Sequence, residues 1–526
     1  MITRKILIFK KYLLIILLTS SIILSVTGCA QEEKSKLFVF CNDALYSLSI
    51  NEQLQIEKTK ITDPVIEVDK GIKTKYFDFG LGAPFFFSSH LISCCQKKVI
   101  FRCREEKLPY PIPSSPISIE TFTVMANIDG SEKRLLKGEK DDDFRAWFAK
   151  EEEKYYYLIV RKKFDETNKT TKYETQLWRA NYDDSGKENL IKNKGLLLIP
   201  ICSPYWEWGF GPIIESPNGG NILFFFSKDN LDPYIHPDLW IMNINSREKR
   251  NITEEMKNYL DDKETCIFET LFTYDGKKII MFVAYTDKFE IWSMNIDGSD
   301  KKNLTRNLIM DKELLHPFFL LSPDNKILFT KIPNYENINE DEYFEGLNLD
   351  IWIMNLDGTD VKKLTEGELK FKFPILPLLS DENIFTTRTI GFGLFPGFIK
   401  FSPDGKKIVF LGKDKNGYSL WIMNSDGSEK KDIGEKIREK FSKDLSKEDL
   451  PRLFRECWFP TFSPDGKYIF FLLPDIETWE EENFENWRYS LWIINQDGSE
   501  INNLSELYDL NIVTDFRWYF LPVFPD

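Results

Sequence analysis

One motif of sixteen residues recurs along the chain with few changes. Clear copies are EIWSMNIDGSDKKNLT from Glu290, DIWIMNLDGTDVKKLT from Asp350, SLWIMNSDGSEKKDIG from Ser419 and SLWIINQDGSEINNLS from Ser490. A unit this short cannot bury an apolar face alone, so a chain of such units must stack them against one another. The repeat therefore constrains the fold more than any other feature of the sequence.

One complete unit runs from Phe401 to Gly434. The SPDG stretch has the proline and glycine of a tight turn, and the following KKIVFLG is rich in β-forming residues. The next strand, YSLWIMN, is apolar on both faces, which is typical of a strand covered on both sides. An Asp-Gly hairpin then leads to a polar edge strand, EKKDIG. The unit is predicted to be a four-stranded antiparallel sheet that neighbouring copies cover, which is the blade of a β-propeller.

The number of blades follows from the anchor residue of each third strand. Eight anchors are found, and they are Tyr46, Phe122 or Val124, Trp178, Trp240, Trp292, Trp352, Trp421 and Trp492. We therefore expect an all-β propeller of eight four-stranded blades over residues 37–526, with seven blades as the alternative because residues 373–390 blur the count. The chain opens on a second-strand pattern, KLFVF, and closes on a first-strand pattern, FRWYFLPVFPD, so the C-terminal strand is expected to complete the N-terminal blade and close the ring.

The unit FSPDGKKIVF followed by LWIMNSDGSEKK resembles the TolB-type (WD40-like, PD40) propeller repeat. The resemblance covers nearly the whole chain after residue 36 and is strongest in the five C-terminal blades. It implies a propeller that docks proteins of the bacterial envelope. Because the first blade is expected to begin directly after the tether, the α/β domain that precedes the propeller in TolB is expected to be missing, which argues against a role identical to that of TolB.

The N-terminus reads as an export signal over residues 1–28. Arg4, Lys5, Lys10 and Lys11 precede an apolar run over 12–26, which is too short for a membrane-spanning helix. Val26-Thr27-Gly28-Cys29 resembles a bacterial lipobox, and this implies lipid attachment at Cys29 followed by a tether over 29–36. The expected location is the bacterial cell envelope, with the protein anchored in the membrane on its periplasmic or cell-surface side. An ordinary signal peptide is the alternative.

The charge balance bears on the partners. The chain has 69 basic and 83 acidic residues, which argues against nucleic acid and leaves proteins and glycans as candidates.

The tryptophans of successive repeats lie 52 to 71 residues apart, while a minimal blade needs about 40–45. The surplus falls in second-to-third and blade-to-blade connections, which share one face in a propeller. Long loops on a rigid scaffold usually carry binding.

Those connections are acidic and aromatic, which suits a basic protein segment or a glycan that stacks on rings. The candidate binding residues are Tyr205, Trp206, Trp208, His236, Asp238, Trp479, Glu480, Glu481, Glu482 and Trp487. Plain solvation of the loops is the alternative for the acidic residues, and core packing is the alternative for Tyr205, Trp206 and Trp208.

Little in the sequence indicates catalysis. Three histidines are present, and Asp232, His236 and Asp238 form a weak metal pattern because a second histidine is missing. No G-x-S-x-G motif occurs, and no pair of acidic residues stands out. We therefore expect no catalytic residue, metal or cofactor. The predicted function is a non-catalytic envelope lipoprotein that docks another protein, and the alternative is a propeller that binds or cleaves glycans.

Overall fold

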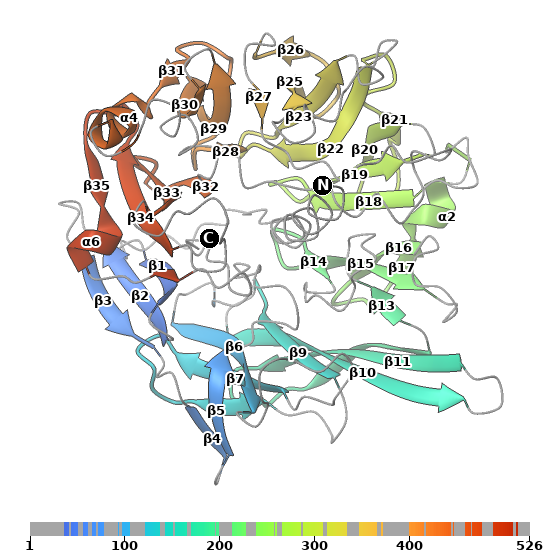
Figure 1. The fold of residues 1–526 in the computed structure, drawn as a ribbon. Coiled ribbons are helices and arrows are strands. Elements are labelled where there is room, and N and C mark those ends of the chain that lie inside the picture. The colour runs from blue at the N-terminus through green and yellow to red at the C-terminus, as the bar shows by residue number, and fades with distance from the viewer. Residues whose placement is uncertain are drawn as a thin grey trace, which may run out of the picture. The chain divides into compact units, whose positions relative to one another are not determined.

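The fold was analysed in a computed structural model. It describes residues 36–41, 44–50, 56–61, 66–69, 72–77, 93, 97–105, 121–136, 143–150, 153–165, 170–194, 196–198, 213–227, 238–256, 258–259, 266–285, 288–308, 313–333, 347–365, 370–371, 399–414, 417–442, 445, 458–463, 465–475, 488–508 and 512–513. These residues form eight antiparallel sheets, here named A to H in chain order (Figure 1).

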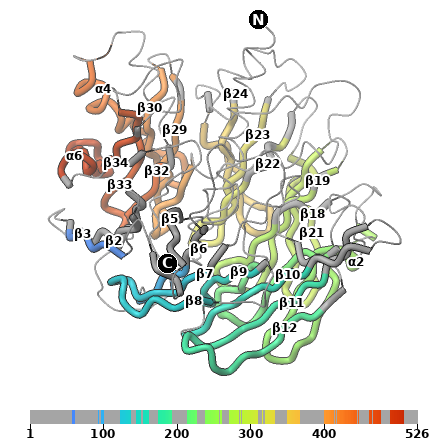
Figure 2. The backbone as a smooth tube through the Cα atoms, turned by 60° about the horizontal axis from the view of Figure 1, so that its bottom comes forward, coloured from blue at the N-terminus to red at the C-terminus, as the bar shows by residue number. Residues whose placement is uncertain are grey.

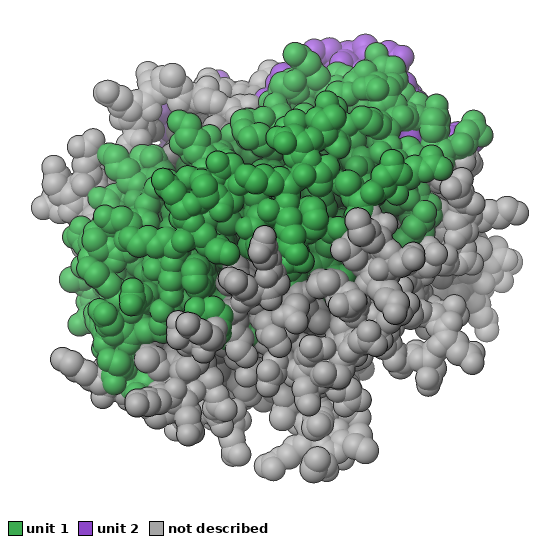
Figure 3. Space-filling view, turned by 90° about the horizontal axis from the view of Figure 1, so that it is seen from above, with its two compact units in different colours: residues 1–26, 202–204, 258–522 green, residues 27–201, 205–257, 523–526 purple. Residues whose placement is uncertain are grey.

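Sheets A to D belong to one compact unit, unit 2, which holds residues 27–201 and 205–257 (Figure 3). Sheet A has β1 (Lys36–Cys41), β2 (Ala44–Ile50) and β3 (Ile56–Lys60). Sheet B has β4 (Ile66–Asp69), β5 (Ile72–Phe77), β6 (Lys98–Glu105), β7 (Thr121–Asn127) and β8 (Arg134–Leu136). Sheet C has β9 (Asp143–Phe148), β10 (Lys154–Asp165), β11 (Thr170–Asn181) and β12 (Glu188–Lys194). Sheet D has β13 (Leu196–Leu198), β14 (Ile214–Glu215), β15 (Asn221–Ser227), β16 (Asp238–Asn243) and β17 (Lys249–Asn251), and helix α2 (Ile252–Met256) follows it.

Sheets E to H belong to unit 1, which holds residues 258–522. Sheet E has β18 (Cys266–Phe272), β19 (Lys278–Ala284), β20 (Phe289–Asn295) and β21 (Lys302–Asn303). Sheet F has β22 (Glu313–Leu321), β23 (Lys326–Pro333), β25 (Asp350–Asn355) and β26 (Lys362–Lys363). Sheet G has β24 (Leu347–Asn348), β27 (Lys370–Phe371), β28 (Ile399–Phe401), β29 (Lys407–Asp414), β30 (Gly417–Asn424) and β31 (Lys431–Asp432), and helix α4 (Glu435–Phe441) follows it. Sheet H has β32 (Trp458–Phe462), β33 (Tyr468–Pro474), β34 (Arg488–Asn495), β35 (Ile501–Asn503) and β36 (Ile512–Val513), with helix α6 (Leu504–Tyr508) after β35.

The predicted repeat unit is confirmed in sheet G. The SPDG turn closes with a hydrogen bond from Gly405 N–H to the Ser402 carbonyl, and the Asp-Gly hairpin closes with one from Gly427 N–H to the Asn424 carbonyl, each 2.8 Å long. The third strand pairs with the second across its whole length, with Trp421 opposite Phe410. Third-strand tryptophans hold the same register in sheets C to H.

The middle strands are buried on both faces, as the repeat predicts. In β19, the five consecutive side chains from Ile279 to Val283 are all 0% exposed. A strand with both faces covered explains why its residues are apolar without alternation. In sheet E the core therefore lies above and below the second and third strands, since β20 is buried from Phe289 to Met294 as well.

The two weakest predicted repeats also pair as expected. KLFVF lies in β1 and pairs with β2, where Tyr46 stands opposite Val39 and Lys60. In sheet B the anchor position is held by Val124, three residues before the turn asparagine Asn127, and not by Phe122.

The all-β class and the repeated antiparallel sheets are confirmed. Closure of the ring and the number of blades stay predictions, because the closing strand over 516–526 and residues 373–390 lie outside the described residues. The connection after β31 begins with a helix, α4. None of the helices in the described part of the chain has the length and hydrophobicity that crossing a membrane requires.

Candidate binding face

The third-to-fourth turns of sheets B, C, E, F and G share one hydrogen-bonding arrangement. In sheet G the Ser428 hydroxyl and N–H both donate to Asp426 Oδ1, at 2.6 and 2.8 Å, and Asn424 Nδ2 donates to Ser428 Oγ at 2.9 Å. The bonds from Ser428 lower the pKa of Asp426 because they favour the ionised carboxylate. These polar groups of the turn thus form hydrogen bonds with one another.

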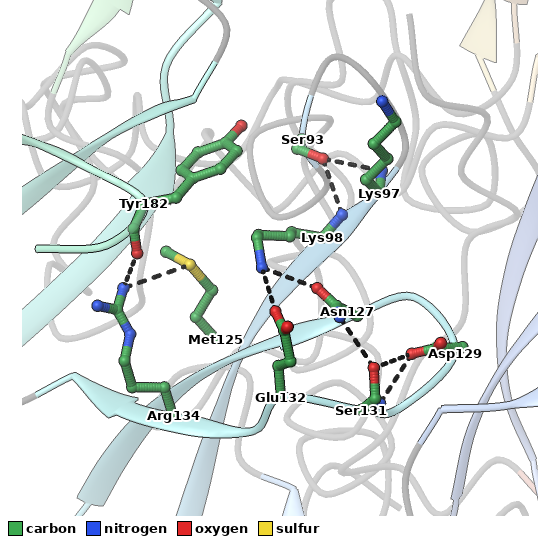
Figure 4. Close-up of polar contacts among 10 residues, drawn as sticks. All are labelled: Ser93, Lys97, Lys98, Met125, Asn127, Asp129, Ser131, Glu132, Arg134 and Tyr182. Atoms are coloured by element: carbon green, nitrogen blue, oxygen red, sulfur yellow. Dashed lines mark hydrogen bonds and ion pairs between the residues drawn. The ribbon is translucent and has the colours of Figure 1, made fainter.

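The same arrangement holds in sheet B, where Figure 4 shows Asn127, Asp129 and Ser131 joined in the turn. Figure 4 also shows a link to the next sheet, because Arg134 Nη2 on β8 donates to the Tyr182 carbonyl in the turn of sheet C. Sheet B is therefore tied to the turn of sheet C.

Unit 1 repeats this link with lysines on its fourth strands, which we call latch lysines. Each donates to a backbone carbonyl in the turn of the following sheet, and the pairs are Lys302 with Asp357, Lys362 with Asp426 at 2.5 Å, and Lys431 with Asp497 at 2.7 Å. Consecutive turns of unit 1 therefore lie side by side along one edge, the turn edge, and its basic side chains bind the protein's own backbone.

The opposite ends of the same strands form what we call the loop edge of unit 1. In an antiparallel sheet the second-to-third connection leaves at the end away from the third-to-fourth turn. The chain between β33 and β34 and the chain between β23 and β25 both leave there. In unit 1 the long connections are therefore attached to the edge that the latch lysines do not occupy.

Glu290 stands at the start of β20 on the loop edge. Its carboxylate accepts from Trp292 Nε1 and from Lys288 Nζ, both at 2.9 Å. Burial raises the pKa of Glu290, but hydrogen bonds from Tyr285, Lys288 and Trp292 outweigh it, so the pKa lies below its ordinary value. This carboxylate is ionised and internally paired, so it serves structure.

The residue two before each third-strand tryptophan decides whether the indole N–H has a partner. Gln176 accepts from Trp178 at 3.1 Å, and Glu290 accepts from Trp292. In the other sheets this residue is aspartate or serine, which is shorter. Within the described part of the chain, no acceptor is in reach of the buried indole N–H of Trp240, Trp352, Trp421 or Trp492.

A buried lysine lies at the loop edge of sheet F. Lys331 is 4% exposed, donates to the Leu308 carbonyl at 2.9 Å and places Nζ 4.0 Å from the ring centroid of Trp352. Lys363 Nζ is 2.9 Å from Asp350 Oδ2 beside the same ring. The indole thus packs against two lysines. Cation–π attraction adds to the hydrogen bond of Lys331 and to the ion pair of Lys363.

Helix α4 is fixed to sheet G and covers sheet H, and Figure 2 shows it close to β30 and β34. Arg438 Nη2 is 2.5 Å from Asp432 Oδ2, and the Ser419 hydroxyl donates to Asp432 Oδ1 at 2.5 Å. The ring of Phe441 meets Trp492 edge-on, with centroids 5.5 Å apart. This tryptophan is 3% exposed, so it packs in the core.

The described charged residues of the loop edge named above are paired within the protein. Across the described ranges, no group of three or more His, Cys, Asp or Glu side chains could hold a metal ion. The charged groups named above already have partners, so ligand recognition by this edge would depend on the connections attached to it.

The predicted site residues fall mainly outside the described residues. Asp238 is the one that is described, at the first position of β16, where it accepts from Asn251 Nδ2 at 3.0 Å and takes part in sheet pairing. The others are Cys29, Tyr205, Trp206, Trp208, His236, Trp479, Glu480, Glu481, Glu482 and Trp487. Their binding roles stay predictions.

Sequence reasoning missed the buried charged residues, among them Lys331 and Glu215. Aligning the repeats position by position would have found Glu215, because it ends a first strand where most other sheets have phenylalanine. Lys331 carries no such signal, since a lysine at a strand end is ordinarily solvated.

Comparison with known proteins gives fold neighbours only. No protein-family model matches the sequence, and no curated protein matches it. Similar solved structures include TolB from Acinetobacter baumannii, with 18% identity and a TM-score of 0.29 over 58% of this chain and 58% of that chain. The match thus spans a little over half of that TolB.

Two further structures are similar over more of the chain. The β-propeller domain of the trilobed protease from Pyrococcus furiosus has 13% identity and a TM-score of 0.35, with 79% of this chain and 94% of that chain covered. An oligogalacturonate lyase in complex with manganese has 12% identity and a TM-score of 0.41, with 85% and 95% covered. At these identities and TM-scores the likeness assigns neither a family nor an activity.

Proposed function

We propose that the protein is a non-catalytic docking scaffold of the bacterial cell envelope. The observation that carries the proposal is the contrast between the two edges of unit 1. The turn edge is closed by the latch lysines, which bind backbone carbonyls 2.5 and 2.7 Å away in two of the joints. The long connections leave from the other edge, where variable segments on a rigid frame suit partner binding.

The proposed partner carries a basic segment. The connection between β33 and β34 contains Glu480, Glu481 and Glu482 between Trp479 and Trp487, and the chain as a whole has a net charge of −14. Clustered carboxylates speed the encounter with a basic partner, and tryptophans supply contact area once it is bound. A glycan that stacks on the same tryptophans is the competing ligand.

The experiment tests this connection with a matched control. The variant Glu480→Lys, Glu481→Lys, Glu482→Lys is compared with Glu429→Lys, Glu435→Lys, Glu439→Lys, which changes three exposed glutamates elsewhere in unit 1. Crosslinking in cells should lose a specific protein partner in the first variant and keep it in the second. Equal partner profiles in both variants and the wild type would refute the docking role of this connection. Glycan-array binding without protein crosslinks would favour the glycan alternative.

We also propose that lipid at Cys29 anchors the protein. The lipobox-like residues 26–29 support this, and two or more acyl chains give stable membrane attachment where one does not. Cys29→Ser should release the protein from the membrane fraction and abolish incorporation of a labelled fatty acid. A Cys29→Ser protein that stays in the membrane fraction contradicts this anchor.

A further inference from the structure

Glu215 breaks the pattern of the first strands. In six sheets the residue that follows the first strand donates its backbone N–H to the residue that begins the second strand, and this shared hydrogen bond aligns the repeats. The position just before that donor holds Phe148, Glu215, Phe272, Leu321, Phe401 and Phe462. A carboxyl group thus stands where the other five sheets have a large apolar side chain, which is buried in four of them.

The carboxyl group of Glu215 joins sheet D to sheet C within unit 2. Glu215 is 4% exposed, although it belongs to the short strand β14. Its Oε1 accepts from the Tyr156 hydroxyl on β10 at 3.0 Å, and its Oε2 accepts from the backbone N–H of Lys150, just after β9, at 2.9 Å. Tyr156 is itself 0% exposed and stacks on Trp147, with ring centroids 6.0 Å apart.

The charges around this group do not offset its burial. Lys150 lies after β9 and Arg179 on β11, and both favour the ionised carboxylate only weakly. Arg179 directs its guanidinium to Glu188, with Nη2 3.2 Å from Oε2, and Arg247 binds the same oxygen at 2.8 Å. Burial is the largest effect and raises the pKa of Glu215 to about 7, against two hydrogen bonds that lower it.

We propose that Glu215 is a proton-operated joint between sheets C and D, closed when its carboxyl group is protonated and loosened when the group ionises. A neutral carboxyl fits an apolar joint with two hydrogen bonds. Among the described residues no ion pair to that carboxylate is found, so an ionised Glu215 gains by reaching water, which it does when β14 moves away from β9 and β10. The proposal does not depend on the docking function.

The direction of the pH effect follows from linkage. The folded pKa lies above the ordinary value of 4.5, so the stabilisation is fully present below about pH 4.5 and is lost as the pH rises to about 7. Each pKa unit is worth a tenfold change in equilibrium, so the opening of the joint should increase about 30-fold between about pH 5.5 and 8.5.

Hydrogen–deuterium exchange of the full mature chain measures this opening, corrected for the intrinsic pH dependence of exchange. The amides to follow are those of Lys150, which binds Glu215, and Ser216, which closes the next turn. In the wild type, protection of both should fall with rising pH. In Glu215→Gln, which stays neutral and can still accept from Lys150, protection should be independent of pH.

Controls separate proton binding from packing. Glu215→Phe copies the residue of sheets E, G and H and should also show no pH dependence, so a failure of one variant to fold leaves the other. Tyr156→Phe removes a hydroxyl that favours the carboxylate, so the wild-type midpoint should move to higher pH. The infrared band of a protonated carboxyl should titrate near neutral pH in the wild type and be missing in Glu215→Gln.

Three results would overturn the proposal. They are a flat exchange profile in the wild type, the same pH slope in wild type and Glu215→Gln, and a titration midpoint unmoved by Tyr156→Phe. Any of these means that the proton on Glu215 does not control the joint.

Discussion

In the described part of the chain no acceptor is in reach of the indole N–H of Trp492, and this makes a stabilising substitution predictable. Trp492 is 3% exposed, and Ser490 stands where Gln176 and Glu290 provide an acceptor at 3.1 and 2.9 Å in other sheets. Ser490→Gln should supply that acceptor. A buried donor without a partner costs about 1–3 kcal/mol, and fixing a glutamine side chain costs up to about 2 kcal/mol. Ser490 is half-buried, and its strand already restricts the side chain, so only part of the entropy cost of fixing the glutamine applies. The expected gain in the free energy of unfolding is therefore about 1 kcal/mol.

Urea unfolding of the mature protein measures the gain, and a double-mutant cycle assigns it. Ser490→Met has similar length and no strong acceptor, so it should not reproduce the gain. In a Trp492→Phe background, which lacks the indole N–H, Ser490→Gln should add nothing. The indole ¹⁵N–¹H resonance of Trp492 should shift downfield in Ser490→Gln. An equal gain from methionine, or a gain that persists without the indole, would refute the hydrogen-bond reasoning.

Two further predictions concern the turn edge. Lys362→Met removes the latch to the Asp426 carbonyl and should lower the free energy of unfolding by less than about 1 kcal/mol, because the lysine is exposed. In a double-mutant cycle with Lys431→Met, the two losses should be additive. Strong coupling between them would contradict this and show that the latches act as one unit. Gly427→Ala should lower the free energy of unfolding by about 1–2 kcal/mol, because Gly427 has φ of +85° and a Cβ would lie 3.1 Å from Leu364 Cδ2. The control Gly220→Ala, with no positive φ and its nearest contact at 3.4 Å, should be nearly neutral in the same urea unfolding experiment. Equal losses in the two variants would contradict this account.

The repeated part of the fold could be predicted from the sequence because each strand carries its own pattern. The turn Ser402–Gly405 and the third strand around Trp421 lie where their residues predict them. The short edge strands β13, β24, β27 and β36 were not expected, because they fall in segments that share nothing with the repeat. The strand register shows that Val124, and not Phe122, is the anchor of sheet B. The strand propensities of valine and phenylalanine do not distinguish the two residues.

The candidate site was less predictable than the fold. Composition identifies acidic and aromatic connections, but it does not say which side chains meet, because loop geometry depends on contacts distant in sequence. Asp238 illustrates this, since a predicted binding residue accepts a hydrogen bond from Asn251 of the neighbouring strand. Glu215 shows the converse, a residue that draws notice only once its burial between two sheets is known.

The latch lysines have a consequence for how such a chain can vary. Donor and acceptor are separated by 55, 64 and 66 residues in successive joints, yet the same pair of atoms meets each time. The added residues are accommodated at the far ends of the strands, so insertions there leave the joint geometry as it is. Such a frame can exchange its connections independently, and grafting foreign peptides between β23 and β25 or between β33 and β34 would make a display scaffold whose folding does not depend on the peptide displayed.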